Sequence, residues 1–264
     1  MSAADVAVAG PGALTAPQQT RSARLAFAWS RLATDRPLAF LTLVLTLIAG
    51  CFAVAQAAPY WAEWLLAAVA LAGLAAALRG APAAWQAQVW CVCVLSIAVE
   101  LLLSHVLRWY VYDSVPIPPY VPVGHGIVYL AALSLSSWID AHPARRPAQR
   151  LFFAAIAASA VAAHLTGSAD EVGLVASALL LVVAGAWRSR RSFLLAMWLL
   201  VSWLEVWGTA IGEWAWRDSA LGLLQGNPPA GIVAAYIGMD CLVMLAARQR
   251  ASSAGARPAA AGAA

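Results

Sequence analysis

The stretch ELLLSHVLRWYVYDS (residues 100–114) recurs 105 residues later as EVWGTAIGEWAWRDS (205–219). Continued without a gap, residues 100–128 match 205–233 at seven positions. None of these is an Ala or a Leu, the residues that this composition would match by chance. The identical pairs are Glu100/Glu205, Trp109/Trp214, Asp113/Asp218, Ser114/Ser219, Gly126/Gly231, Ile127/Ile232 and Val128/Val233. The match indicates an internal duplication and gives each half one glutamate at the same place.

The composition around this stretch is that of a membrane protein. Hydrophobic residues make up 63% of the chain and charged residues 11%. Eight apolar runs are long enough to cross a bilayer as helices, and spanning strands are excluded because open sheet edges cannot lie in lipid. The runs are 37–57, 61–79, 84–108, 121–138, 149–166, 169–187, 192–213 and 228–247. We therefore predict an all-α, polytopic bundle of eight transmembrane helices.

The placement of arginine predicts the orientation. All 16 basic residues are Arg, and with eight spans 14 of them fall on the side that carries both termini. The other side holds Arg108 and Arg217. Positive residues collect on the cytoplasmic side of membrane proteins. The pattern predicts a multi-pass protein of the cell (plasma or inner) membrane with both termini in the cytoplasm.

The duplication divides the chain into two four-span repeats, 37–138 and 139–250. An even number of spans makes the repeats parallel, related by an axis along the membrane normal. The ends of the chain, 1–20 and 251–264, are predicted to be disordered tails. Residues 21–36 alternate arginines with apolar residues, which indicates either a basic amphipathic segment on the membrane surface or a simple juxtamembrane linker.

The glutamates of the repeat are the strongest candidates for chemistry. An ionisable residue inside a membrane costs several kcal/mol and normally faces the interior of the bundle. The repeat axis could bring Glu100 and Glu205 together, and a buried acid that stays protonated is a ready proton donor. Polar groups that only hold helices together are the alternative. Asp240, in the last run, pairs with a neighbouring hydroxyl or lies on a proton path.

The segments beside Glu205 and the outer loops supply the remaining candidates. Glu213, Asp113 and Asp218 could position water or substrate; in a purely structural role, the two aspartates would cap helices or pair with arginines. A binding pocket could be walled by residues on the outer side of the bundle. These are Trp203, Trp207, Thr209, Trp214 and His125.

Other kinds of site lack a signature. The outer histidines have no metal-ligand spacing, so no metal is predicted. The four cysteines lie in apolar runs, as small core residues do. The chain has no phosphate loop, nucleophile elbow or dinucleotide fingerprint, so no cofactor is expected. No basic patch carries interleaved aromatics, which excludes nucleic acid as an expected partner.

The pattern from Glu205 to Pro228 resembles that of bacterial carotenoid-biosynthesis integral membrane proteins of the carotenoid-hydratase type. That pattern has a Glu, a Gly and a Thr, a Gly before two aromatics, and a later Gly and Pro. Its counterparts here are Glu205, Gly208, Thr209, Gly212, Trp214, Trp216, Gly222, Gly226 and Pro228. This chain departs from the family in having Gly-Glu before tryptophans instead of Phe-Gly before tyrosines. The resemblance implies an acid-assisted reaction on a long isoprenoid in the bilayer.

Three functions remain open from the sequence. The first is an integral membrane enzyme in which Glu205, with Glu100, donates a proton to an isoprenoid or other lipid. The second is a proton-coupled transporter or permease, since parallel repeats with buried carboxylates suit transport as well. The third is a non-catalytic membrane partner protein. Membrane lipids are the expected partners, with a lipid-soluble substrate in the first case, and the oligomeric state is left open.

Overall fold

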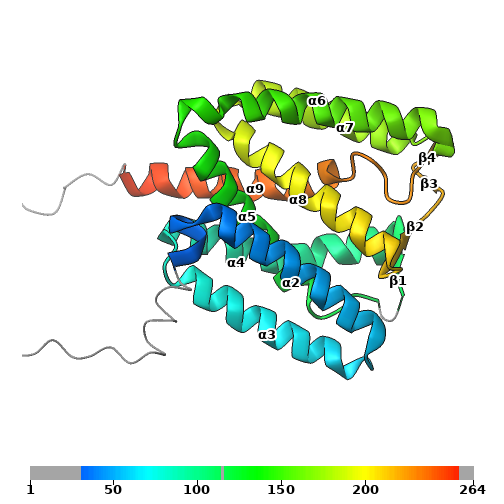
Figure 1. The fold of residues 1–264 in the computed structure, drawn as a ribbon, viewed down its shortest axis with the longest axis horizontal. Helices are drawn as coiled ribbons and strands as arrows, with labels where there is room; N and C mark the ends of the chain where they lie inside the picture. Colours follow the sequence, from blue (N-terminus) through cyan, green and yellow to red (C-terminus); the bar gives the residue numbers. More distant parts are fainter. Residues whose placement is uncertain (1–30, 114–115, 256–264) are drawn as a thin grey trace, which may run out of the picture.

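The computed structural model describes residues 31–113 and 116–255, and it is mostly helical. A helix lies in each of the eight apolar runs (Figure 1). The helices are α2 (Pro37–Ala57), α3 (Trp61–Leu78), α4 (Ala83–Glu100), α5 (Val121–Asp140), α6 (Arg146–Ala163), α7 (Glu171–Ala186), α8 (Arg191–Ala210) and α9 (Val233–Gly255). Short turns extend or precede them: π-helical η1 (Leu101–Val106) and η3 (His164–Ser168), and 3₁₀ turns η2 (Pro143–Arg145) and η4 (Arg188–Arg190).

Among the described residues, six helices are long and apolar enough to cross a membrane. They are α2, α3, α4 with η1, α5, α6 with its flanking turns, and α8 with η4. The apolar parts of α7 and α9, Glu171–Ala186 and Tyr236–Ala247, are shorter. The last helix begins at Val233 and not near 228, because the prolines that precede it lie in a turn.

That turn is held by Asp170, which also begins α7. One carboxylate oxygen of Asp170 accepts hydrogen bonds from the backbone N–H of Gly173, in the first turn of α7, and from that of Gly226, each at 2.9 Å. The other oxygen accepts from the N–H of Ala230 at 2.7 Å. An aspartate at a helix N-cap satisfies a free backbone donor of the first turn. Asp170 therefore fixes the start of α7 and the approach to α9 together.

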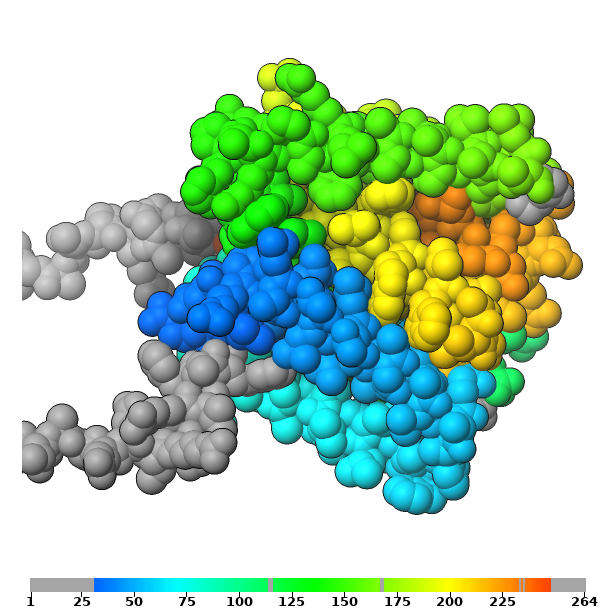
Figure 2. Space-filling view, in the orientation of Figure 1, coloured from blue at the N-terminus to red at the C-terminus, as the bar shows by residue number. Residues whose placement is uncertain are grey.

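Helix α5 lies at the centre of the bundle. It packs against α8, α4, α2 and α3, and residues Tyr129–Ala132 of α5 have no solvent exposure. Helix α4 also packs against α9, while α6 and α7 pack together at the other edge. Figure 2 shows α2, α3 and α8 side by side on one face of the molecule.

The two ends of the bundle differ. One end, here called the ribbon end, carries strands β1 (Tyr110–Tyr112), β2 (Trp214–Trp216), β3 (Ser219–Ala220) and β4 (Leu223–Leu224). β1 and β2 pair antiparallel, with Tyr110 opposite Trp216 and Tyr112 opposite Trp214. The other end, the arginine end, carries the connections 79–82, 141–145 and 187–190 and the start of α2 and end of α9 (Figure 1).

The outward faces of the helices are apolar. Leu47 on α2, Val69 on α3, Val94 on α4 and Val206 on α8 are more than half exposed. Exposed apolar surface of this extent is unusual for a water-soluble protein and normal for a lipid-facing one.

The predicted ends of the chain fall mostly outside the described residues. Of the segment 21–36, only 31–36 are described; residues 31–35 are helical, and Arg31 pairs with Asp35 at 2.9 Å. At the other terminus α9 continues to Gly255, so the described residues 251–255 are helical although the sequence predicts a disordered tail from 251.

Candidate functional site

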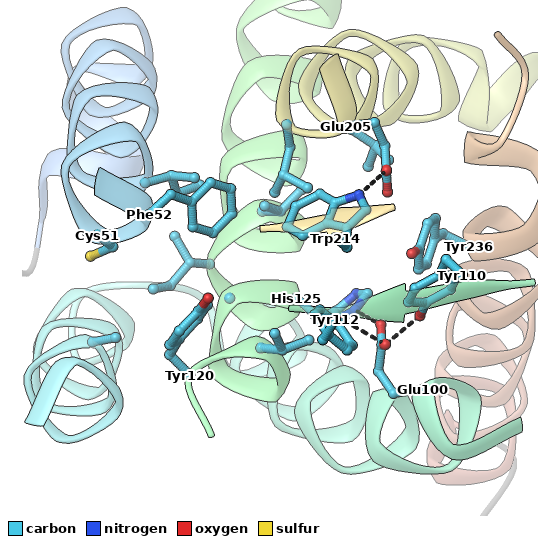
Figure 3. A pocket seen from close by; sticks show the side chains of 18 of the residues that line it. Cys51, Phe52, Glu100, Tyr110, Tyr112, Tyr120, His125, Glu205, Trp214 and Tyr236 are labelled. Atoms are coloured by element: carbon cyan, nitrogen blue, oxygen red, sulfur yellow. Dashed lines mark hydrogen bonds and ion pairs between the residues drawn. The ribbon is translucent and has the colours of Figure 1, made fainter. Parts of the chain in front are cut away.

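A cavity of about 100 Å³ lies between α2, α4, α5, α8 and α9, near the ribbon end (Figure 3). Glu100, the last residue of α4, and Glu205, on α8, both line it. The two side chains are 1% and 2% exposed. The structure thus brings together, inside the bundle, the two glutamates that the sequence repeat relates.

Glu100 is surrounded by hydrogen-bond donors. Tyr112 Oη donates to Glu100 Oε2 at 2.8 Å, and Tyr110 Oη donates to the same oxygen. The other oxygen, Oε1, lies 2.9 Å from Nε2 of His125 on α5. Burial, and after it the Glu100 carboxylate, raise the pKa of both β1 tyrosines well above the usual range, so their hydroxyls remain donors. This arrangement satisfies an ionised carboxylate.

Glu205 has a different environment. Its Oε2 accepts hydrogen bonds from the indole N–H groups of Trp214 at 2.8 Å and Trp216 at 3.0 Å. No described residue forms a salt bridge with Glu205. Burial away from water and from any cation favours the neutral form of a carboxyl group. The two glutamates therefore face one cavity from contrasting surroundings, as the acid and the base of an active site commonly do.

The ribbon explains why both tryptophans reach Glu205. Alternate residues of a strand point to the same side, so Trp214 and Trp216 of β2 face the bundle together. The Trp214 ring lies against Gly208 of α8, where an added Cβ would come within 2.2–2.7 Å of it. The absence of a side chain at Gly208 lets the indole approach the helix that carries Glu205.

Aromatic rings form much of the remaining wall. Phe52 and Trp214 meet edge to face with centroids 5.3 Å apart, and the rings of His125 and Tyr236 lie 5.2 Å apart. The aromatic lining residues are Phe52, Tyr110, Tyr112, Tyr120, Trp214 and Tyr236. No arginine lines the cavity among the described residues. Aromatic faces attract positive charge, so this wall suits a cation or a cationic intermediate.

The cavity reaches the side of the bundle between α2 and α3. Ile48 and Cys51 of α2 and Ala70 of α3 line it, and each is partly exposed. All three lie within helices long enough to cross a membrane. This opening faces the side of the bundle and not either end.

Glu213 lies beside the cavity and not in its wall. It is buried, accepts a hydrogen bond from Gln56 Nε2 at 2.8 Å, and accepts another from the hydroxyl of Tyr120, which does line the cavity. Burial raises the pKa of Glu213, the hydrogen bond from Gln56 opposes that rise, and the nearby carboxylates Glu63 and Asp113 add to it.

The structure separates the other predicted site residues from the cavity. Asp113 and Asp218 are exposed in the loops at the ribbon end. Trp207 is 38% exposed on the outside of α8, and Trp203 and Thr209 are partly buried elsewhere on the same helix. Of the ten predicted residues, the cavity wall holds Glu100, Glu205, Trp214 and His125.

The sequence prediction missed the tyrosines. Tyr110 and Tyr112 carry a usable signal, because YVY alternates as a strand does, with its aromatic residues on one face, and WAW (214–216) alternates in the same way. Phe52, Tyr120 and Tyr236 carry none, since a single aromatic residue in an apolar run is normally core or interface.

This set of residues can move protons in an apolar surrounding. It offers one carboxyl group favoured as an acid, one favoured as a carboxylate and touching a histidine, and tyrosine hydroxyls between them.

Searches of family models, of curated proteins and of solved structures find no match to this chain.

Proposed function

We propose that the chain is an integral membrane enzyme that performs acid-assisted chemistry on an isoprenoid or other lipid within the bilayer. The observation that carries this is the aromatic cavity that holds two buried glutamates in contrasting environments and is lined on one side by α2 and α3. A lipid-soluble substrate would enter between α2 and α3 without passing through water. The resemblance of 205–228 to carotenoid-biosynthesis proteins suggests the isoprenoid class.

The proposed topology has all eight helices crossing the membrane, with the arginine end in the cytoplasm. Six helices have the length and composition that this needs, and the apolar exposed faces support it. The apolar parts of α7 and α9 are shorter; local thinning of the bilayer or snorkelling of flanking side chains accommodates a short span. Most of the described arginines lie at the arginine end, whereas Arg108 and Arg217 lie at the ribbon end. Because positive residues collect on the cytoplasmic side, this contrast supports a cytoplasmic arginine end.

Two features support a pair of parallel repeats. Across the ribbon, Tyr110 pairs with Trp216, the repeat mate of Val111, while Val111 pairs with Ala215, the repeat mate of Tyr110. This reciprocal exchange is what a two-fold axis through the ribbon produces. Likewise α5 packs against α8 and α4 packs against α9, so the fourth helix of each half lies on the third helix of the other.

In the proposed reaction Glu205 gives its proton to one carbon of an alkene. The π electrons form the new C–H bond, and the other carbon becomes a tertiary carbocation next to the aromatic wall. The cation is then quenched in one of two balanced ways. A neighbouring C–H bond loses its proton to Glu100, or water adds through oxygen and its one proton passes to Glu100, which is hydrogen-bonded to His125.

Proton-coupled transport is the second candidate. A cavity with two acids and aromatic walls also fits a lipophilic cation, which would exchange for protons. A transporter would leave the lipid composition of its cells unchanged and would carry protons across vesicles. A non-catalytic membrane partner would leave the lipid composition unchanged and would carry no protons.

The proposal is tested by mass spectrometry of apolar lipids from three isogenic strains of the host of origin. One lacks the gene, one expresses the full chain, and one expresses Glu205→Gln. We expect a lipid species that depends on the wild-type chain and is lost with Glu205→Gln. The matched control is Glu171→Gln, because Glu171 accepts from the backbone N–H of Leu224, away from the cavity. If no lipid distinguishes the first two strains, the enzyme proposal is wrong.

A further inference from the structure

Asp240 is a second buried acid that the cavity does not use. It lies on α9, has no solvent exposure, and does not line the cavity. No described residue hydrogen-bonds either of its carboxylate oxygens. An ionised carboxylate in such surroundings costs several kcal/mol, whereas the neutral acid costs much less and carries a proton.

The neighbour of Asp240 toward the ribbon end is Tyr236. The two residues are four apart on α9, which places them one above the other on the same helix face, with about 5–6 Å between their Cβ atoms. Tyr236 is part of the cavity wall, and its hydroxyl interacts with Tyr110 and Glu205. Asp240 thus lies one helical turn from the proton-handling groups of the cavity.

Tyr129 of α5 lies within electrostatic reach of Asp240. It is fully buried, and both Asp240 and Arg190, a residue of the arginine end, act on it electrostatically. The hydroxyl of Tyr129 donates to Gln88 Oε1 at 2.9 Å. Gln88 is five residues from the first residue of α4, about 7–8 Å along the helix. Gln88 and Tyr129 therefore supply buried polar groups on the arginine-end side of the cavity.

We propose that Asp240 carries a proton between the arginine end and the cavity along the column Tyr129–Asp240–Tyr236. Only O–H bonds are made and broken: each hydroxyl or carboxyl group accepts a proton on one side and releases one on the other, and nothing is oxidised or reduced. The column gives the cavity a proton supply from the end opposite the ribbon. It operates whether or not the cavity turns over a lipid.

A purely structural role fits Asp240 less well. Carboxylates that hold helices together do so through hydrogen bonds, as Asp140 does with Ser192 Oγ at 2.6 Å. Asp240 has the burial of such a residue without the bonds. Replacing it by Asn therefore removes a proton carrier and no observed contact.

The test is infrared spectroscopy of the full chain in lipid nanodiscs, without substrate. A protonated carboxyl group has a C=O band separate from that of a carboxylate. We expect Asp240→Asn to remove one such band, while the matched Asp140→Asn leaves it. In D₂O the Asp240 band should shift as its proton exchanges, and Tyr236→Phe together with Tyr129→Phe should slow this exchange by about tenfold or more.

Three results would overturn the proton path. The Asp240 band is absent because the group is ionised; the band is present and never exchanges; or exchange proceeds at the wild-type rate in the double tyrosine variant. The wild-type and tyrosine measurements decide the question even if Asp240→Asn does not fold. Since no substrate is present, failure here leaves the lipid reaction standing, and failure of the lipid experiment leaves this result standing.

Discussion

Tyr110 and Trp216 face each other across the ribbon with ring centroids 4.6 Å apart, and each donates a hydrogen bond to a different buried glutamate. The Tyr110 hydroxyl donates to Glu100, and the Trp216 indole donates to Glu205. One short pair of strands, outside the spanning helices, therefore orients the two acids of the cavity at once.

Trp216→Phe should weaken the site through this link. The ring remains, but a buried Glu205 oxygen loses one of its two donors, and a lost hydrogen bond to a buried polar group costs about 1–3 kcal/mol. We expect a lower thermal unfolding temperature in detergent and reduced product formation. Trp207→Phe is the matched control, since Trp207 is partly exposed on the outside of α8. Equal effects of the two substitutions would show that the hydrogen bond contributes nothing.

His125→Gln should separate proton transfer from structure. The glutamine amide can still donate to Glu100, so the unfolding temperature should stay near that of the wild type. It cannot take up a proton, so turnover of the lipid should fall by about 10²- to 10⁴-fold. His105→Gln serves as control, because His105 is exposed and contacts Ser104. Full activity in His125→Gln would leave His125 as a positioning residue only.

Glu213 should make stability depend on pH in a defined direction. In the unfolded chain its carboxyl titrates near the ordinary value of 4.5, and in the folded protein its pKa is higher. As pH rises above 4.5, the unfolded chain therefore loses this proton first and gains stability relative to the folded protein. The contribution of Glu213 to stability should fall through this window and level off above the folded pKa.

Glu213→Gln removes that titration, and the glutamine oxygen can still accept from Tyr120. The unfolding temperature of the variant, relative to wild type, should rise with pH from about 4.5 upward and then become constant. Tryptophan fluorescence during heating, at a series of pH values, measures this difference. A difference that stays flat, or that falls with pH, contradicts the raised pKa.

Gly208→Ala should disturb the cavity by overpacking. The new methyl group meets the Trp214 ring well inside contact distance, and crowding of this kind costs about 1–3 kcal/mol. We expect reduced stability and a changed Trp214 fluorescence. In Gly185→Ala the methyl group has open space in the last turn of α7, so the better helix propensity of Ala should leave stability unchanged or raise it by up to about 1 kcal/mol. A harmless Gly208→Ala would show that Trp214 moves freely.

The helices and the pair of acids were predictable from the sequence, because both depend on patterns along the chain. Long apolar runs predict helices. An ionisable side chain is costly to expose to lipid, so it is predicted to be buried inside the bundle, as found for Glu100 and Glu205. The repeat added the expectation that the two glutamates meet. Two run lengths were overestimated: the chain before α9 is folded into a turn by Asp170, and α7 begins directly after that aspartate.

The surroundings of the acids were less predictable. Aromatic residues near the ends of spans normally anchor a protein at the membrane interface, and the sequence offers no way to tell such anchors from Trp214 and Trp216, which are buried against Glu205. Tyr236 meets Tyr110 only because α9 packs against α4. Contacts of this kind depend on how helices cross, which local sequence does not encode.

The opening between α2 and α3 has a kinetic consequence. A ligand that enters there is drawn from a two-dimensional solution, so its capture rate follows its mole fraction among the surrounding lipids and not its amount per volume of buffer. Diluting a fixed quantity of substrate with inert phospholipid would then slow the protein, even though the bulk concentrations of substrate and protein in the tube were held constant.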